Sequence, residues 1–342
     1  MRQAAVLGTG LIGTSIGIGL RAAGWHVKAW DPASDVLEQA LTMGSCDTAS
    51  PSQEEAMKDS DLVFLCGPVR AIIDTLGSLE TTVLITDVAG VKAPVVEAGR
   101  HLSGFVGGHP MAGRELSGPE GATGSLFRGA SWVLTPDNPD APAVSEISKV
   151  IESLGAIPVI TDAVSHDRGV ASASHLPHLT AVALVEALEA DHEALGLAAG
   201  GFRDLTRVAL SDPGWWVDVL IANRAQVGPA IRRLVTELLG LASVVESSDA
   251  EALVRHLIKA RNVRSGMAAP VSGVSLILED QPGEMARVGH SLSESGVDLR
   301  DLQLRHSQHG GGGVLTLSVR SSEVEKLRGA LIQDGFRLID PL

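Results

Sequence analysis

Residues 106–113 (VGGHPMAG) set a single histidine, His109, between two glycines and a proline. The glycines allow close approach of the backbone, and Pro110 favours an extended conformation at His109. Because the segment ends a short apolar run, we expect the imidazole at the carboxyl end of a strand, where open α/β sheets bind ligands. A neutral imidazole there can take a proton from a substrate hydroxyl. The same residues also fit a tight turn that merely contains a histidine.

Gly8, Gly10 and Gly13 form a GxGxxG pattern directly after one apolar run and at the start of a helical pattern. In a dinucleotide site the first glycine permits the turn, the second admits the pyrophosphate, and the third lets helix and strand pack closely. The helix N-terminus then faces the anionic phosphates. Leu11 and Ile12, inside the pattern, are assigned to the same cofactor site.

Asp31 ends the next predicted strand, which is the position of the ribose-binding acid in such sites. Its carboxylate can accept hydrogen bonds from both ribose hydroxyls and would repel a 2′-phosphate. We therefore predict that the cofactor is NAD rather than NADP. The alternative is a turn residue placed before Pro32.

Four further polar residues are candidates for a substrate site. His178 lies with His175 at i, i+3 spacing at the start of an apolar helix, without the third ligand that a metal site would need. Arg207 can bind a carboxylate with two hydrogen bonds while Asp204 orients it, although such spacing also suits a surface helix. Glu115 fits either a charged gate or a solvated loop acid.

Composition limits the classes of function. The chain has 342 residues and a formal net charge of −14, which argues against nucleic acid or an anionic membrane surface as a partner. No run of apolar residues is long enough to span a membrane. Cys46 and Cys66 have no metal-ligand spacing, so we expect reduced thiols in a cytoplasmic protein.

Three regions must position these residues. Residues 1–162 alternate short apolar runs with helical patterns, which predicts a Rossmann-type α/β domain with a parallel sheet covered on both faces. The predicted strands are 3–8, 26–31, 62–67, 83–88, 105–108, 131–136 and 157–160.

Residues 163–269 are predicted to form long helices with broad apolar faces, which fit either a homodimer interface or an intramolecular core. Residues 270–342 read as βαββαβ, the order of a ferredoxin-like unit.

Taken together, these motifs resemble the prephenate dehydrogenase family of tyrosine biosynthesis along essentially the whole chain. The matching segments are GTGLIGTS, TDVAGVK, GGHPMAGRELSG, SHLPH and GGFRDLTRVALSDP. Residues 270–342 resemble an ACT domain, an amino-acid-sensing module. The resemblance implies a Rossmann domain, a helical dimerisation domain and a regulatory domain that takes an aromatic amino acid as effector.

The resemblance also implies an activity, namely the oxidation of prephenate by NAD⁺ with loss of CO₂ to give 4-hydroxyphenylpyruvate. In that reaction His109 would be the base, Arg207 would bind a substrate carboxylate with Asp204 orienting it, Glu115 would be a gating acid, and His178 would line the pocket. The sequence departs from the family at Gly90, where a serine commonly helps to hold the substrate hydroxyl and the catalytic histidine. A second departure is Asp298, where many sensing domains have asparagine.

Other functions fit parts of the pattern. Arogenate dehydrogenase shares the fold and chemistry, and no residue separates the two substrates. A non-catalytic amino-acid sensor with a relict nucleotide fold would not need the whole set of glycines, acid, histidine and arginine. A β-hydroxyacid dehydrogenase would need a lysine in the first long helix, and residues 175–190 (HLPHLTAVALVEALEA) contain none.

Overall fold

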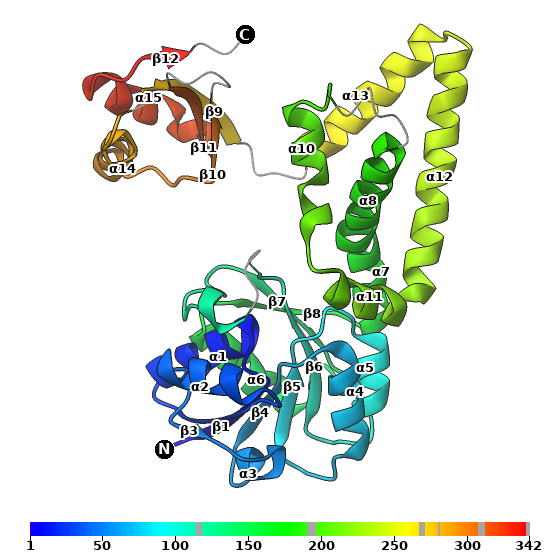
Figure 1. Cartoon of the computed structure of the whole chain (residues 1–342), viewed down its shortest axis with the longest axis vertical. Coiled ribbons are helices and arrows are strands. Elements are labelled where there is room, and N and C mark those ends of the chain that lie inside the picture. The colour runs from blue at the N-terminus through cyan, green and yellow to red at the C-terminus, as the bar shows by residue number, and fades with distance from the viewer. Residues whose placement is uncertain (114–117, 190–195, 267–270, 280, 307–311, 340–342) are drawn as a thin grey trace. The chain divides into compact units, whose positions relative to one another are not determined.

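The computed structural model describes residues 1–113, 118–189, 196–266, 271–279, 281–306 and 312–339 (Figure 1). Contacts divide the chain into two compact units, Met1–Thr236 and Glu237–Leu342. The division into three domains expected from the sequence, 1–162, 163–269 and 270–342, stays a prediction.

An eight-stranded sheet forms the centre of the first unit, with the strand order β3-β2-β1-β4-β5-β6-β7-β8. Its strands are β1 (Gln3–Leu7), β2 (His26–Trp30), β3 (Thr48–Ala49), β4 (Leu62–Leu65), β5 (Leu84–Asp87), β6 (Phe105–Pro110), β7 (Ser131–Thr135) and β8 (Ile157–Ile160). The order reverses between β1 and β4, which creates the switch point where such sheets bind ligands. Because β1, β4, β5 and β6 are parallel, their carboxyl ends meet at one edge.

The prediction of a wholly parallel sheet is wrong at β7, which pairs antiparallel with β6. Among the described residues between β6 and β7, the chain forms only the short η1 (Pro119–Gly121) and no α-helix. The described part of this connection therefore supplies no crossover helix of the kind that a parallel connection uses. The two-residue strand β3 was also not predicted.

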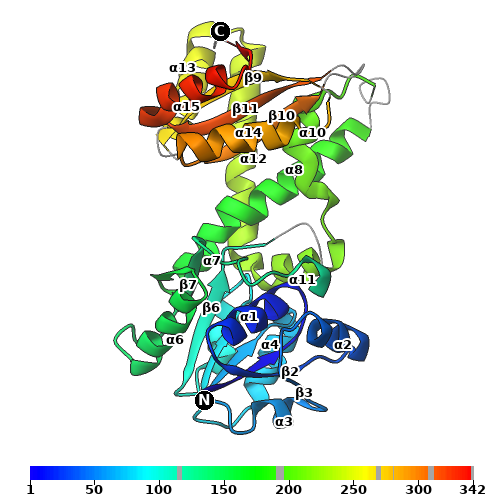
Figure 2. The same ribbon diagram turned by 90° about the vertical axis from the view of Figure 1, so that its left-hand side faces the viewer.

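Helices cover both faces of the sheet (Figures 1 and 2). They are α1 (Leu11–Ala22), α2 (Ser34–Thr42), α3 (Gln53–Met57), α4 (Val69–Ser78), α5 (Ala93–Gly99) and α6 (Pro142–Ser153). Apolar side chains of α1 and α6, such as Ile16 and Ile147, form a core on one face. Those of α4 and α5, such as Ile72 and Val95, form a second core on the other face, which Val219 of a later helix joins.

Beyond the sheet the chain becomes helical, as predicted. The segments are α7 (Ala163–Val170), a π-helical turn η2 (Ala171–His175), α8 (Leu176–Glu189), α10 (Gly200–Thr206), the 3-10 turn η3 (Arg207–Leu210), α11 (Pro213–Ala222), α12 (Arg224–Glu246) and α13 (Ala250–Gly266). The side chain of Asp162 accepts a hydrogen bond from Ser165 N (2.8 Å) and so caps the start of α7.

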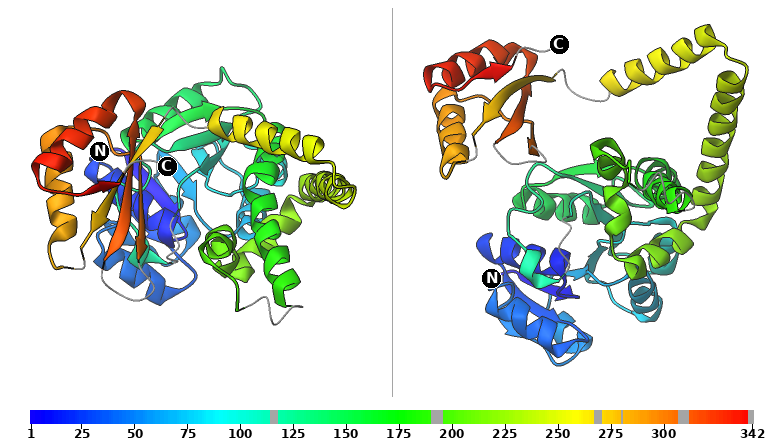
Figure 3. Two further views of the ribbon diagram at one scale, coloured as in Figure 1. Left: turned by 90° about the horizontal axis from the view of Figure 1, so that it is seen from above. Right: turned by 45° about the horizontal axis from the view of Figure 1, so that its top comes forward.

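The C-terminal residues form a four-stranded antiparallel sheet with the order β10-β11-β9-β12 (Figure 3). Its elements are β9 (Val271–Leu278), α14 (Glu284–Ser295), β10 (Asp301–His306), β11 (Gly313–Arg320), η4 (Ser321–Glu323), α15 (Val324–Gln333) and β12 (Leu338–Ile339). This is the predicted βαββαβ order, and its core includes Leu276, Leu317 and Leu327.

Candidate active site

His109 is the fifth of the six residues of β6 and lies opposite Val133 of β7. The prediction that it ends a strand is confirmed. Its Nε2 atom faces Gly90, where an added Cβ would lie 3.7 Å away. The loop carrying Gly90 follows β5, so the imidazole lies at the edge formed by the strands' carboxyl ends.

A buried ion pair holds the backbone just before His109. Asp87 and Lys92, both fully buried, contact each other through Oδ2 and Nζ. Asp87 Oδ1 accepts a hydrogen bond from Gly108 N (2.9 Å), and Lys92 Nζ donates one to Gly108 O (2.6 Å). Both the backbone nitrogen and the backbone oxygen of Gly108 are thus held by this ion pair. A side chain there would collide with Asp87 O and Thr86 Oγ1, 2.5 and 2.6 Å from its Cβ.

On its other side, His109 contacts a second histidine. His109 Nδ1 lies 2.8 Å from His166 Nε2, and His166 Nδ1 lies 2.8 Å from Asp167 Oδ1. The two rings meet edge to face, with centroids 5.1 Å apart. A chain of hydrogen bonds therefore leads from His109 to a carboxylate on α7.

That carboxylate is itself fixed by the start of α5. Asp167 accepts hydrogen bonds from Lys92 N (2.7 Å) and Ala93 N (2.8 Å). Asn223, at the end of α11, donates to the backbone oxygen of Asp167 (2.9 Å) and lies 3.2 Å from His175 Nδ1. The network joins the sheet domain to the helices that follow it.

The surroundings of His109 favour its neutral form. Burial lowers its pKa well below 6.5, and the positive charge of Lys92 and the neighbouring His166 and His175 lower it further. Burial also lowers the pKa of Lys92, against the opposing effect of Asp87. The imidazole is therefore a base that stays unprotonated at neutral pH.

His178 lies in a separate aromatic group. Its ring stacks on Trp216 with centroids 3.8 Å apart, and His175 meets the same indole edge to face at 5.9 Å. Burial lowers the pKa of His178, and its buried Nδ1 has no hydrogen-bond partner among the described residues. That His178 lines the substrate pocket stays a prediction.

The glycine-rich turn fits a dinucleotide. Gly8 has φ +100°, and a Cβ on it would lie 2.8 Å from the backbone of Cys66. A Cβ on Gly13 would lie 1.9 Å from Gly8 O, whereas one on Gly10 would meet nothing within 4 Å. Gly8 and Gly13 thus close the turn, while Gly10 leaves open space at the N-terminus of α1 for a phosphate. Leu11 and Ile12 form the first residues of α1.

Asp31 follows β2 and braces the same turn. Its Oδ2 accepts hydrogen bonds from Thr9 N (2.7 Å) and Thr9 Oγ1 (3.2 Å), and its Oδ1 accepts one from Ala33 N (3.0 Å). The carboxylate is half-buried and fixed beside the glycine-rich turn, as a ribose-binding acid must be.

The structure gives less information on the remaining predicted residues, which are Glu115, Asp204 and Arg207. Glu115 lies outside the described residues. Asp204 and Arg207 are exposed at the end of α10 and the start of η3, and η3 packs against α8, which carries His178. The structure therefore brings Arg207 and His178 onto neighbouring elements.

Sequence reasoning missed His166, Asp167, Asp87 and Lys92. Asp87 and Lys92 stood in the quoted segment TDVAGVK, where a lysine five residues after an aspartate in an apolar stretch was an available signal. His166 lies 57 residues from His109, and nothing in the local pattern indicated their contact.

The described ranges contain neither a metal site nor a membrane-spanning helix. No group of residues there is able to hold a metal ion, and no helix is long and apolar enough to cross a membrane.

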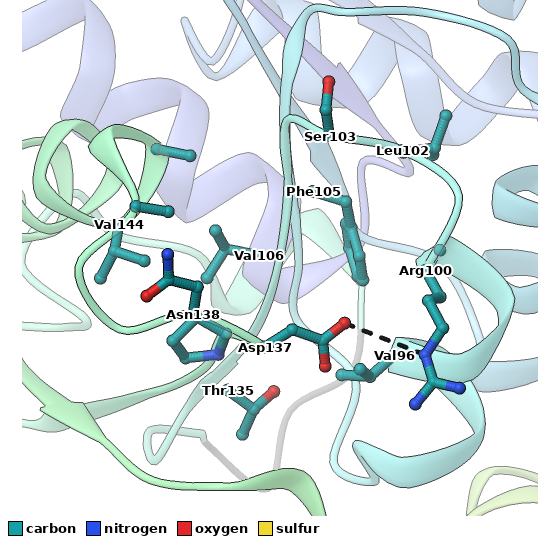
Figure 4. A pocket seen from close by; sticks show the side chains of 14 residues that line it. Val96, Arg100, Leu102, Ser103, Phe105, Val106, Thr135, Asp137, Asn138 and Val144 are labelled. Carbon is teal, nitrogen blue, oxygen red and sulfur yellow. Dashed lines mark ion pairs between the residues drawn. The ribbon is translucent and has the colours of Figure 1, made fainter.

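A cavity of about 180 Å³, lined by side chains including Phe105, Val106 and Val144, lies near Phe105, the first residue of β6 (Figure 4). It is therefore at the other end of this strand from His109. Arg100 and Asp137, which also line it, form an ion pair of 3.9 Å.

Comparison with known proteins agrees with this geometry. The family described as "Prephenate dehydrogenase, nucleotide-binding domain" matches residues 16–160, and "Prephenate dehydrogenase, dimerization domain" matches residues 162–259. The prephenate dehydrogenase of Bacillus subtilis is 30% identical, over 93% of this chain and 92% of its own length.

Solved structures give the same result. Prephenate dehydrogenase from A. aeolicus, in complex with hydroxyphenyl propionate and NAD⁺, has a TM-score of 0.73 at 29% identity and covers 78% of this chain and 99% of its own. The arogenate dehydrogenase of Synechocystis has a TM-score of 0.69 at 29% identity, covering 78% of this chain and all of its own.

Proposed function

Since the chain belongs to the prephenate dehydrogenase family, we propose that it converts prephenate to 4-hydroxyphenylpyruvate and CO₂. The observation that carries the proposal is the placement of His109, a half-buried neutral imidazole whose Nε2 faces the loop of Gly90 at the edge where the glycine-rich turn also lies.

NAD is the cofactor, and when bound it accepts the hydride that leaves C4 of the substrate ring. The turn of Gly8, Gly10 and Gly13 would hold its pyrophosphate, and Asp31 would accept hydrogen bonds from its ribose. The carboxylate of Asp31 disfavours the 2′-phosphate of NADP by charge repulsion.

His109 manages the proton. As the C4 hydrogen leaves as hydride, Nε2 takes the proton of the C4 hydroxyl and a carbonyl forms. The bond from the ring to its carboxylate then breaks, CO₂ departs, and the electron pair makes the ring aromatic with negative charge on the former hydroxyl oxygen. His109 returns the proton to that oxygen, so no net proton is released.

Other residues would hold the substrate. Arg207 is proposed to bind a carboxylate of the dianion and Asp204 to orient it, with His178 and Trp216 packed nearby as an apolar and aromatic wall. Glu115 keeps its proposed role as a gating acid. Asp87 and Lys92 keep the peptide before His109 in place.

Steady-state assays test the proposal. The purified protein should turn over prephenate with NAD⁺ at a higher kcat/KM than arogenate with NAD⁺, and prephenate with NADP⁺ should be poorer than with NAD⁺. H109N should lower kcat about 10²-fold or more, with little change in NAD⁺ affinity, because it removes the base. A higher kcat/KM for arogenate would make arogenate dehydrogenase, the alternative that shares this site, the correct function.

Assembly and regulation complete the proposal. The helices of residues 163–269 carry exposed apolar side chains, including Leu238, Leu239 and Leu257, which a second copy of the chain would cover in a homodimer. Residues 270–342 are proposed to be an ACT domain that binds an aromatic amino acid, supported by their βαββαβ order. A cytoplasmic location stays a prediction.

A further inference from the structure

The pair His166–Asp167 lies directly behind the proposed base His109. We propose that these positioning residues hold His109 in the one tautomer that leaves its Nε2 free to take the substrate proton. The inference rests on the proposed function in so far as His109 is the base, and it deepens that function by naming what prepares the base.

The first step concerns Asp167. Its carboxylate accepts hydrogen bonds from Lys92 N and Ala93 N, both donors at the start of α5, and it is almost fully buried. An ionised carboxylate has no hydrogen to donate. His166 Nδ1, 2.8 Å from Asp167 Oδ1, must therefore carry the hydrogen in this contact.

The second step follows from the chemistry of imidazole. A neutral imidazole has one N–H, so a neutral His166 with its hydrogen at Nδ1 presents a lone pair at Nε2. That lone pair accepts a hydrogen bond from His109 Nδ1–H at 2.8 Å. His109 then has its own lone pair at Nε2.

The third step concerns the opposite face of His109. Nε2 points toward Gly90, which has no side chain that could orient the ring from that side. Among the contacts that the His109 side chain makes with described residues, the hydrogen bond to His166 sets both its tautomer and its ring orientation. When Nε2 gains its proton, His109 becomes positively charged. The carboxylate of Asp167, which lies beyond the His166 ring, then opposes the effect of the nearby positive charge of Lys92.

A spectroscopic measurement tests the proposal without substrate. In protein labelled with ¹⁵N-histidine, long-range ¹H–¹⁵N correlation spectra report which ring nitrogen carries hydrogen, and H109N identifies the His109 signals. We expect hydrogen on Nδ1 and none on Nε2. A wild-type His109 that carries its hydrogen on Nε2 overturns the proposal.

Kinetics of two variants test the consequence. H166F keeps a ring of similar size but removes the acceptor, so kcat should fall about 10- to 100-fold, part of the roughly 10²–10⁴-fold that general-base catalysis supplies. The KM for substrate should change less than threefold, because His166 is not proposed to touch the substrate. H166Q, whose amide oxygen can accept from His109 Nδ1–H, should recover most of the loss.

Controls separate positioning from structure. H101F changes an exposed histidine of the same domain and should leave kcat unchanged. In the H109N background H166F should lower kcat no further, because its effect passes through His109. An equal loss in both backgrounds, or full activity of H166F, contradicts the proposal.

The proposal can still be tested if H166F does not fold or if prephenate is not the substrate. If H166F does not fold, the tautomer of the wild type and of H166Q decides. If prephenate is not the substrate, the same variants are measured with whichever substrate turns over, and the tautomer result stands apart from the proposed function.

Discussion

At the scale of single residues, three histidines of the site share one electrostatic condition. Burial lowers the pKa of His109, His175 and His178, and that of His175 falls to about 4. The folded protein therefore holds these rings neutral at pH values where the unfolded chain would protonate them.

This condition predicts how stability depends on pH. Between pH 6.5 and about 4 the unfolded chain binds a proton at His175 that the folded protein does not, so acidification favours unfolding in that window. The free energy of unfolding, measured by urea denaturation at several pH values, should fall across this window. H175Q should show a shallower fall, whereas H101Q, a change at an exposed histidine, should follow the wild type. Identical slopes in H175Q and the wild type would refute the assignment.

Arg207 carries a prediction about substrate binding. Losing a charge-assisted hydrogen bond costs about 1.5–3 kcal/mol, so R207A should raise the substrate KM roughly 10- to 100-fold. The KM for NAD⁺ should stay close to that of the wild type. R203A removes an exposed arginine one turn earlier and serves as the matched control. An unchanged substrate KM in R207A would mean that its charge does not meet the substrate.

At the scale of elements, the glycine-rich turn separates a structural from a binding requirement. Gly13 lies where α1 crosses the end of β1, and its missing side chain lets the two approach. Gly10 meets no protein atom, and its missing side chain leaves space for a ligand. Substitutions of these two glycines should therefore have different effects, on stability at Gly13 and on ligand binding at Gly10.

Alanine substitutions test this difference. G13A forces a Cβ against Gly8 O and should destabilise the protein by about 1–3 kcal/mol, seen as a lower Tm without cofactor. G10A should keep the wild-type Tm and weaken NAD⁺ binding, measured by calorimetric titration. A G10A variant with full NAD⁺ affinity would show that the pyrophosphate lies elsewhere.

The positions of strands and helices could be predicted from the sequence more accurately than the contacts between them. Apolar runs located β1 and β4 to within a few residues, because a strand buried on both faces needs local hydrophobicity. The reversed direction of β7 depends on a connection without a crossover helix, which local hydrophobicity does not encode. In the site, His109 stood out through its flanking glycines, whereas its contact with His166 exists only after α7 docks beside α5.

At the scale of the whole molecule, all groups proposed for chemistry lie before residue 217, and the βαββαβ unit begins at Val271. The unit has its own apolar core, formed by residues of its own strands and helices such as Leu276, Leu317 and Leu327.

A chain truncated after Gly266 should keep turnover and lose its response to aromatic amino acids. Coupling between sites is typically about 1–3 kcal/mol, so inhibition of the full chain by tyrosine or phenylalanine should be about 5- to 150-fold in apparent affinity. Initial rates with and without each amino acid measure this, and light scattering of both chains checks that assembly is unchanged. A full chain that neither binds nor responds to any aromatic amino acid would leave the unit with only a stabilising role.

The π-helical turn Ala171–His175 has a consequence for how this chain can vary in length. Side chains advance about 100° per residue in an α-helix, so His166 and His178, twelve positions apart, would point about 120° away from each other. A π-turn absorbs one extra residue, which brings the two directions to within about 20°. Removing one exposed residue there, such as Ser172, would restore a plain α-helix and rotate everything beyond it. Along this stretch the number of residues matters more than their identity, and a one-residue deletion would be more harmful than most substitutions.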